Sequence, residues 1–188
     1  MKPMYEGNNE IDKPKPEEWS PIDVERLFIF CLFDRAMPYE KVCKSYEFFD
    51  KQGLLDFDKI CKSGYESLIF TCKASGLRFY RETARYLFEN ATMHNGDSLM
   101  KMTRDELVQK CPGIGYKLAS MFCNRIHKTQ YAIIDVHIDR FLAAHGCVAK
   151  TYLSKEKDFI EIARGMNMTP DELDWKIWNE NRIGNRKK

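Results

Sequence analysis

The chain has 188 residues, of which 44% are hydrophobic and 13% aromatic, and its formal net charge is +2 at pH 7. This composition excludes a disordered chain, and the length suits one domain or two small lobes with a real core. No apolar run reaches the length that spans a bilayer, so we expect no membrane as a partner.

Residues 1–18 combine charges with Gly, Asn and Pro and are predicted to form a flexible N-terminal tail. The first helix begins at Ser20-Pro21, a capping residue followed by proline, and its apolar residues recur at helical spacing up to Leu32. Strand alternation is almost absent, so the predicted fold class is all-α. The further helices are predicted over residues 39–49, 57–62, 67–75, 78–90, 104–110, 116–127, 136–145, 155–166 and 170–179.

The most informative stretch is Pro112-Gly113-Ile114-Gly115, a tight turn whose two glycines supply backbone freedom and leave amide N–H groups uncovered. Such a hairpin at the start of a helix can hold one DNA phosphate on backbone donors and the helix dipole. Lys117 then lies in the first turn of that helix. Asp135 follows a strand-like run over residues 131–134. A phosphate-binding hairpin, an amine and a carboxylate indicate an enzyme that acts on a DNA sugar.

Basic residues are concentrated locally although the net charge is small. The segment from Leu107 to Ile134 has no acidic residue, and neither has the segment from Asn181 to Lys188. Local basic faces on a nearly neutral protein are typical of an enzyme that binds and releases nucleic acid. The basic residues of the two segments are Lys110, Lys117, Arg125 and Lys128, and Arg182, Arg186, Lys187 and Lys188.

The seven cysteines show no C-x-x-C spacing, their number is odd, and no signal peptide precedes them. We therefore expect reduced, mostly buried thiols in an intracellular protein. Nothing after Cys147 could complete a zinc site or an iron–sulfur cluster, so neither is expected.

Each of these features also has an ordinary explanation. A lone Pro-Gly-x-Gly hairpin more often belongs to a non-catalytic DNA-binding module than to an enzyme. Lys117 could be a solvated lysine and Asp135 a helix N-cap worth about 1 kcal/mol. His137 could be a packed side chain and Trp178 part of the core. The combination of hairpin, lysine, fixed interval and Ile-Ile-Asp-x-His favours catalysis.

This combination resembles the helix-hairpin-helix DNA glycosylase superfamily, and within it the archaeal-type, or type 2, 8-oxoguanine DNA glycosylases. The resemblance implies a two-lobed helical fold with the active-site cleft between the lobes, a domain over residues 19–188 and a hairpin at about residues 104–127. The motifs that carry it are Gly76-Leu77-Arg78-Phe79-Tyr80-Arg81, Gly113-Ile114-Gly115-Tyr116-Lys117-x-Ala119-Ser120, Ala132-Ile133-Ile134-Asp135-x-His137-Ile138 and Leu173-Asp174-x-x-Ile177-Trp178.

The resemblance also implies an activity, because members with lysine at the position of Lys117 are bifunctional glycosylase/AP lyases. The Lys117 amine would form a Schiff base with the damaged nucleotide, and elimination would then nick the strand. Asp135 would stabilise the developing charge on the sugar. An ordinary lysine titrates near about 10.4. The helix dipole, the basic neighbours and the lack of nearby acids before Asp135 are expected to favour the neutral amine.

Recognition of a damaged base requires the base to leave the stack. Trp178 is the candidate platform for the extruded base, and Phe79 the candidate to fill the vacated position. The resemblance implicates the C-terminal Lys188 in reading the base. It also implies an optional monovalent cation on hairpin carbonyls and no other cofactor. The residues expected to bind DNA phosphate are Gly113, Gly115, Tyr116 and His137.

Three hypotheses follow. The first is a monomeric 8-oxoguanine glycosylase/lyase that acts on double-stranded DNA containing the damaged base, in an intracellular compartment that holds DNA. The second is a related enzyme for another oxidised or deaminated base. The third is a non-catalytic hairpin module that binds DNA.

Overall fold

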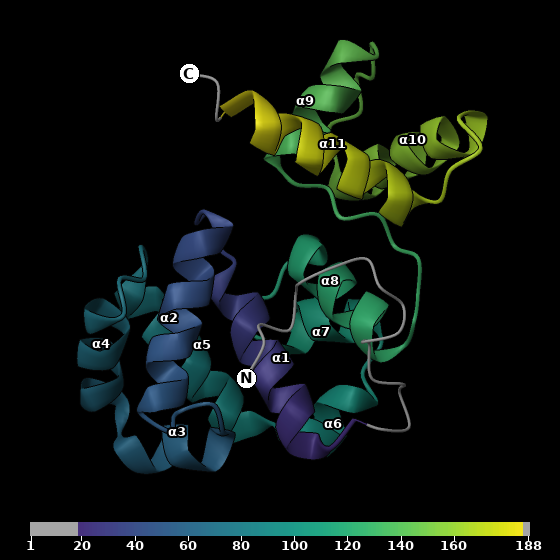
Figure 1. Ribbon diagram of the computed structural model, residues 1–188. Coiled ribbons are helices and arrows are strands. Elements are labelled where there is room, and N and C mark those ends of the chain that lie inside the picture. Colours follow the sequence, from purple (N-terminus) through teal and green to yellow (C-terminus); the bar gives the residue numbers. More distant parts are fainter. Residues whose placement is uncertain (1–18, 186–188) are drawn as a thin grey trace. The chain divides into compact units, whose positions relative to one another are not determined.

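The computed structural model describes the backbone of residues 19–185 and the side chains of residues 19–180 (Figure 1). Every regular element in this range is a helix, which confirms the all-α prediction. None of these helices is long and apolar enough to cross a membrane. The predicted tail, residues 1–18, lies outside the described residues, so the start of the domain at residue 19 stays a prediction.

The chain divides into two compact units, with the boundary between Gly115 and Tyr116. The sequence predicted every helix of the described range except the short α6. Unit 1 contains α1 (Pro21–Phe33), α2 (Tyr39–Lys51), α3 (Phe57–Ser63), α4 (Tyr65–Ala74), α5 (Tyr80–Met93), α6 (Gly96–Met100) and α7 (Arg104–Lys110). Unit 2 contains α8 (Tyr116–Ile126), α9 (Val136–Ala144), α10 (Tyr152–Gly165) and α11 (Pro170–Asn185).

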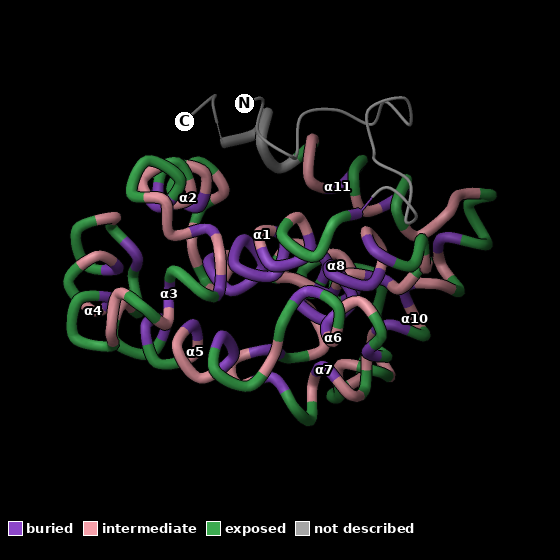
Figure 2. Tube along the Cα trace, turned by 90° about the horizontal axis from the view of Figure 1, so that it is seen from below, coloured by how far each residue is buried: buried purple, intermediate pink, exposed green. Residues whose placement is uncertain are grey.

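Helix α1 is the most deeply buried element of unit 1. Ser20 caps it, because its Oγ accepts a hydrogen bond from the Asp23 N–H at 3.2 Å, and Pro21 occupies the first turn as predicted. The helix is buried along most of its length (Figure 2), and α2, α5 and α6 pack against it. Residues 27–33 of α1 are apolar on every side, and such a stretch is stable only when it is covered in this way.

A buried carboxylate ties α1 to the starts of two other helices. Glu25 is only 6% exposed and accepts hydrogen bonds from the N–H groups of Phe57, at 2.9 Å, and Gly96, at 3.0 Å. A Cβ at Gly96 would overlap the backbone of Pro21. Sequence periodicity missed α6 because five residues are too few to show a helical period. The feature of the sequence that could have predicted α6 is the capping box that begins at Asn95.

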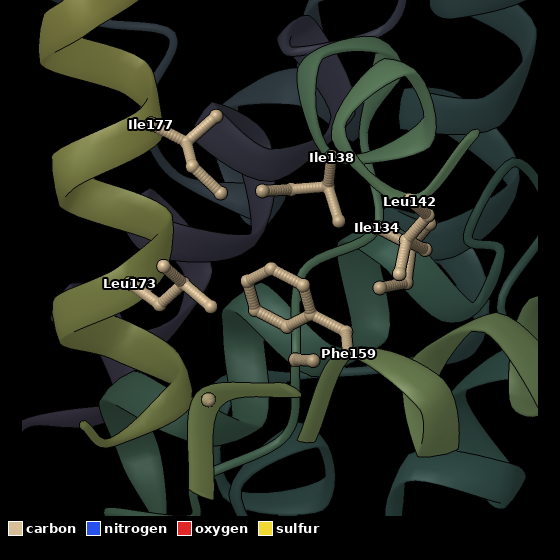
Figure 3. Close-up of a cluster of buried hydrophobic side chains, with 8 residues drawn as sticks. Ile134, Ile138, Leu142, Phe159, Leu173 and Ile177 are labelled. Carbon is tan, nitrogen blue, oxygen red and sulfur yellow. The ribbon is translucent and has the colours of Figure 1, made fainter. Parts of the chain in front are cut away.

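In unit 2, α9, α10 and α11 pack around one apolar core (Figure 3). The ring of Phe159 on α10 points toward Leu173 of α11, while Ile138 of α9 and Ile177 of α11 face one another. Helix α10 begins three residues earlier than predicted, because its N-cap Thr151 forms a capping box. This core supports the segment that leads into α9.

The cysteine side chains lie mostly in the interior, as the sequence predicts. All seven are free, and four of them are buried. Burial raises the pKa of the Cys72 and Cys111 thiols to about 12, so these two stay protonated at neutral pH. Across the described part of the chain, no group of three or more His, Cys, Asp or Glu side chains is arranged to hold a metal ion.

Candidate functional site

The hairpin after α7 depends on a residue in a left-handed conformation. Gly113 has a φ of +84°, which residues with a Cβ rarely adopt. A Cβ at this position would also lie 2.5 Å from Cδ2 of Tyr86 on α5. At Gly115 neither restriction applies, since its φ is not positive and nothing lies within 4 Å of its Cβ position. The backbone freedom predicted for both glycines is therefore needed at Gly113, while Gly115 leaves the hairpin surface uncovered.

One stripe of α5 holds the hairpin in place. Tyr86 and Asn90 are four residues apart and therefore lie on the same face of the helix, and His94 follows as its C-cap. The fully buried Asn90 donates from Nδ2 to the carbonyl of Pro112 at 2.9 Å and to that of Tyr86 at 2.7 Å. Nε2 of His94 lies 3.3 Å from the carbonyl oxygen of Lys110. Sequence reasoning found no role for Asn90, although an amide on a buried helix face was an available signal.

Lys117 occupies the second position of α8, in the first turn, as predicted. Its side chain is partly buried. The first turn of a helix has N–H groups without intrahelical partners and carries the positive end of the helix dipole. Gly115, just before the helix, is exposed. The start of α8 therefore combines an amine with a region that attracts anions.

Asp135 caps α9 with one of its two carboxylate oxygens. Oδ1 accepts hydrogen bonds from the N–H groups of His137, at 2.7 Å, and Ile138, at 3.0 Å. The interpretation of Asp135 as an N-cap is thus correct, but it does not exclude chemistry. Both capping bonds fall on Oδ1. One side chain can therefore cap the helix and present an oxygen to a substrate.

A third ionisable residue of unit 2, Asp174 on α11, interacts electrostatically with both Lys117 and Asp135. The pKa of the Asp174 carboxyl is raised to about 7, mainly by burial and also by the charges of Asp135 and Asp171, while the charge of Lys117 acts to lower it. The sequence shows no acid near Lys117 before Asp135, and Asp174, which follows Asp135 in the chain, adds a second carboxyl beside the lysine. Distance along the sequence does not reveal an acid that approaches from another helix. The feature of the sequence that pointed to Asp174 was its place in the motif Leu173-Asp174-x-x-Ile177-Trp178.

The residues predicted to bind DNA have different environments. Phe79 is the N-cap of α5 and is 37% exposed, and its ring lies 5.2 Å from the Arg78 guanidinium carbon. Trp178 on α11 is partly buried and is not part of the apolar core of unit 2. His137 is partly buried, and its Nδ1 has no hydrogen-bond partner among the described residues. Lys188 lies outside the described residues.

Comparison with known families decides to which group the chain belongs. A family model described as 8-oxoguanine DNA glycosylase, Ogg-HhH, matches residues 26–174, a range that includes Lys117, Asp135 and Asp174. The chain belongs to this family. The helix-hairpin-helix resemblance inferred from the motifs is thereby confirmed.

Known members of the 8-oxoguanine DNA glycosylase family resemble the chain in sequence and in fold. A relative from Thermoplasma volcanium, named 8-oxoguanine DNA glycosylase/AP lyase, is 35% identical over 121 residues, which are 56% of this chain and 57% of that protein. The chain thus spans little more than half the length of this curated relative.

Two crystal structures from Methanocaldococcus jannaschii share the fold. The 8-oxoguanine DNA glycosylase matches with a TM-score of 0.73 and 27% identity, over 88% of this chain and 81% of that one. The glycosylase/lyase in complex with 15mer DNA containing 8-oxoguanine matches with a TM-score of 0.71 and 26% identity, over 87% and 82%. Both confirm the helical glycosylase fold.

Proposed function

We propose that the protein is a bifunctional DNA repair enzyme that excises 8-oxoguanine and nicks the strand at the resulting abasic site. The observation that carries this proposal is the grouping of Lys117 with two carboxylates, Asp135 and Asp174, at the start of a helix that follows a glycine hairpin. Family membership and the activity named for the relatives support the same reaction.

Lys117 is proposed as the nucleophile. Its neutral Nζ attacks C1′ of the damaged nucleotide, the glycosidic bond breaks, and the base leaves with the bonding electrons and takes up a proton. Opening of the sugar ring then gives a Schiff base between Nζ and C1′. Loss of a proton from C2′ expels the 3′ phosphate and cleaves the strand.

Two carboxyl groups are proposed to stabilise positive charge and to transfer protons in these steps. Asp135, with Oδ2 directed to the substrate, stabilises the positive charge that develops on the sugar. Asp174, whose pKa is about 7, is divided between its acid and its base form at neutral pH. A group in this state suits proton transfer to and from the leaving base or the sugar.

DNA binding is assigned to the hairpin and to aromatic side chains. The uncovered backbone at Gly115 and the first turn of α8 are proposed to bind one phosphate, together with Tyr116 and His137. Trp178 stacks on the extruded base, and Phe79 fills the gap that it leaves. Lys188 reads the base, and hairpin carbonyls hold an optional monovalent cation.

The proposed partner is double-stranded DNA with a damaged base, bound by a monomer in an intracellular compartment that contains DNA. A glycosylase/lyase for another oxidised or deaminated base uses the same residues and remains the second candidate. A non-catalytic DNA-binding module is the third, and Lys117 together with Asp135 argues against it.

The deciding experiment is borohydride trapping on a panel of duplexes, each with a single lesion. The wild-type protein is expected to form a covalent adduct and to cleave most strongly at 8-oxoguanine. Lys117→Gln should abolish the adduct while DNA binding persists, because glutamine has similar length but no nucleophilic amine. Lys110→Gln is the matched control, since Lys110 is a hairpin lysine that pairs with Glu106 at 2.8 Å. Undiminished trapping by the Lys117 variant would refute the assignment, and strongest cleavage of another lesion would favour the second candidate.

A further inference from the structure

The first residue of α10 binds the segment that carries Asp135. The Tyr152 hydroxyl donates a hydrogen bond to the carbonyl of Ala132 at 2.9 Å and accepts one from the N–H of Ile134 at 3.1 Å. In the same segment the Asp135 N–H donates to the carbonyl of Ile133 at 3.1 Å. One side-chain oxygen thus fixes the backbone on both sides of Ile133 and immediately before Asp135.

The ring of the same tyrosine contacts the helix that carries Lys117. The rings of Tyr152 and Tyr116 are stacked, with centroids 5.6 Å apart and planes at 21°. Tyr116 is the first residue of α8 and directly precedes Lys117. Aromatic rings at this separation attract one another beyond the area that they bury. The stacking therefore restrains the first turn of α8.

Tyr152 is itself held firmly. It packs against the apolar core of unit 2, which also contains Ala132 and Ile134. The start of α10 is fixed by the capping box in which Thr151 Oγ1 accepts from the Ser154 N–H at 3.2 Å. Because the backbone of Tyr152 is fixed, its hydroxyl can hold residues 132–134 in place and its ring can hold Tyr116 in place.

We propose that Tyr152 is a positioning residue that fixes the distance and orientation between Asp135 and Lys117. Its hydroxyl acts on the Asp135 side and its ring on the Lys117 side, so the two contributions are chemically separable. The inference rests on the proposed function, because it assigns Tyr152 to the geometry of that reaction. Tyr152 acts through residues 132–134 and through Tyr116.

The test compares two steps of the reaction in single-turnover experiments with saturating enzyme. Tyr152→Phe removes both hydrogen bonds and keeps the ring. Excision of 8-oxoguanine should fall about 10- to 100-fold, the scale expected when a catalytic group moves by a fraction of an ångström to an ångström. Cleavage at a preformed abasic site should fall much less, because the stacking on Tyr116 remains. Tyr152→Leu removes the ring as well and should impair both steps.

Ser154→Ala provides the matched control, because it removes only the hydrogen bonds of the Ser154 hydroxyl to Thr151 and keeps the Ser154 N–H bond to Thr151 Oγ1 that fixes the start of α10. It should leave the ratio of excision to abasic-site cleavage unchanged at temperatures below the melting point of each variant. Amide hydrogen exchange gives an independent readout, in which Tyr152→Phe should lose protection at Ile134 but keep it at Leu142 in α9.

Three outcomes would overturn the inference. The first is a Tyr152→Phe enzyme with the wild-type ratio of the two steps, and the second is a Ser154→Ala enzyme with the same altered ratio as Tyr152→Phe. The third is unchanged protection at Ile134 in Tyr152→Phe. Failure of the wild-type protein to form a borohydride adduct would instead refute the proposed function, before any variant is compared.

Discussion

Replacement of Gly113 by alanine tests whether the hairpin is built as described. The substitution forces a residue with a Cβ into a φ of +84°, which costs about 1–2 kcal/mol. The new methyl group would lie 2.5 Å from Cδ2 of Tyr86, and such overpacking costs about 1–3 kcal/mol. Together these terms lower the free energy of unfolding by roughly 2–5 kcal/mol.

Thermal and urea unfolding would measure this loss, at about 2–4 °C in melting temperature per kcal/mol for a chain of this size. Gly115→Ala is the control, since its added methyl group meets no atom within 4 Å. It should change stability by less than about 0.5 kcal/mol but weaken DNA binding. In a Tyr86→Ala background the steric part of the Gly113→Ala cost should disappear, leaving a coupling energy of about 1–3 kcal/mol. Wild-type stability of Gly113→Ala, or strict additivity with Tyr86→Ala, would refute the reasoning.

Three further predictions concern unit 2. Asp135→Asn should nearly abolish base removal with an unchanged melting temperature, because an asparagine oxygen can still accept the two capping bonds; near wild-type excision would show that Asp135 is only structural. Asp174 takes up a proton on folding between pH 4 and 7, because its pKa rises from 3.8 to about 7. Its contribution to the free energy of unfolding is therefore complete below pH 4 and is lost as the pH rises to 7. Urea titrations over this range should show that the free energy of unfolding of the wild type falls by on the order of 4 kcal/mol. Asp174→Asn should remove this fall, and an identical fall in that variant would contradict the assignment of the pH dependence to Asp174. Trp178→Ala should reduce excision of 8-oxoguanine through a loss of stacking of roughly 1–3 kcal/mol while sparing cleavage at abasic sites, whereas equal loss on both substrates would remove Trp178 from base recognition.

Features set by neighbouring residues were predictable from the sequence. Ser20-Pro21, Thr103 and Asp135 each begin a helix, because a capping oxygen bonds to backbone N–H groups two or three residues further along. The hairpin and the position of Lys117 also follow from local chemistry, since Gly113 adopts the left-handed conformation that glycine favours. Family membership was predictable for the same reason, because its motifs are short runs around these local features.

The tertiary structure alone decided which distant residues meet at the site. Asn90 holds Pro112 across 22 positions of sequence, Asp174 approaches Lys117 from another helix, and Tyr152 reaches back to Ala132. None of these contacts leaves a periodic or capping signal, because each partner is already a plausible residue of its own helix. The sequence determined the helices, the caps and the candidate nucleophile, whereas the packing of one helix on another determined what surrounds that nucleophile. The physical reason is range: hydrogen bonds within a turn depend on a few adjacent residues, but burial and the pKa of Asp174 depend on every element that encloses it.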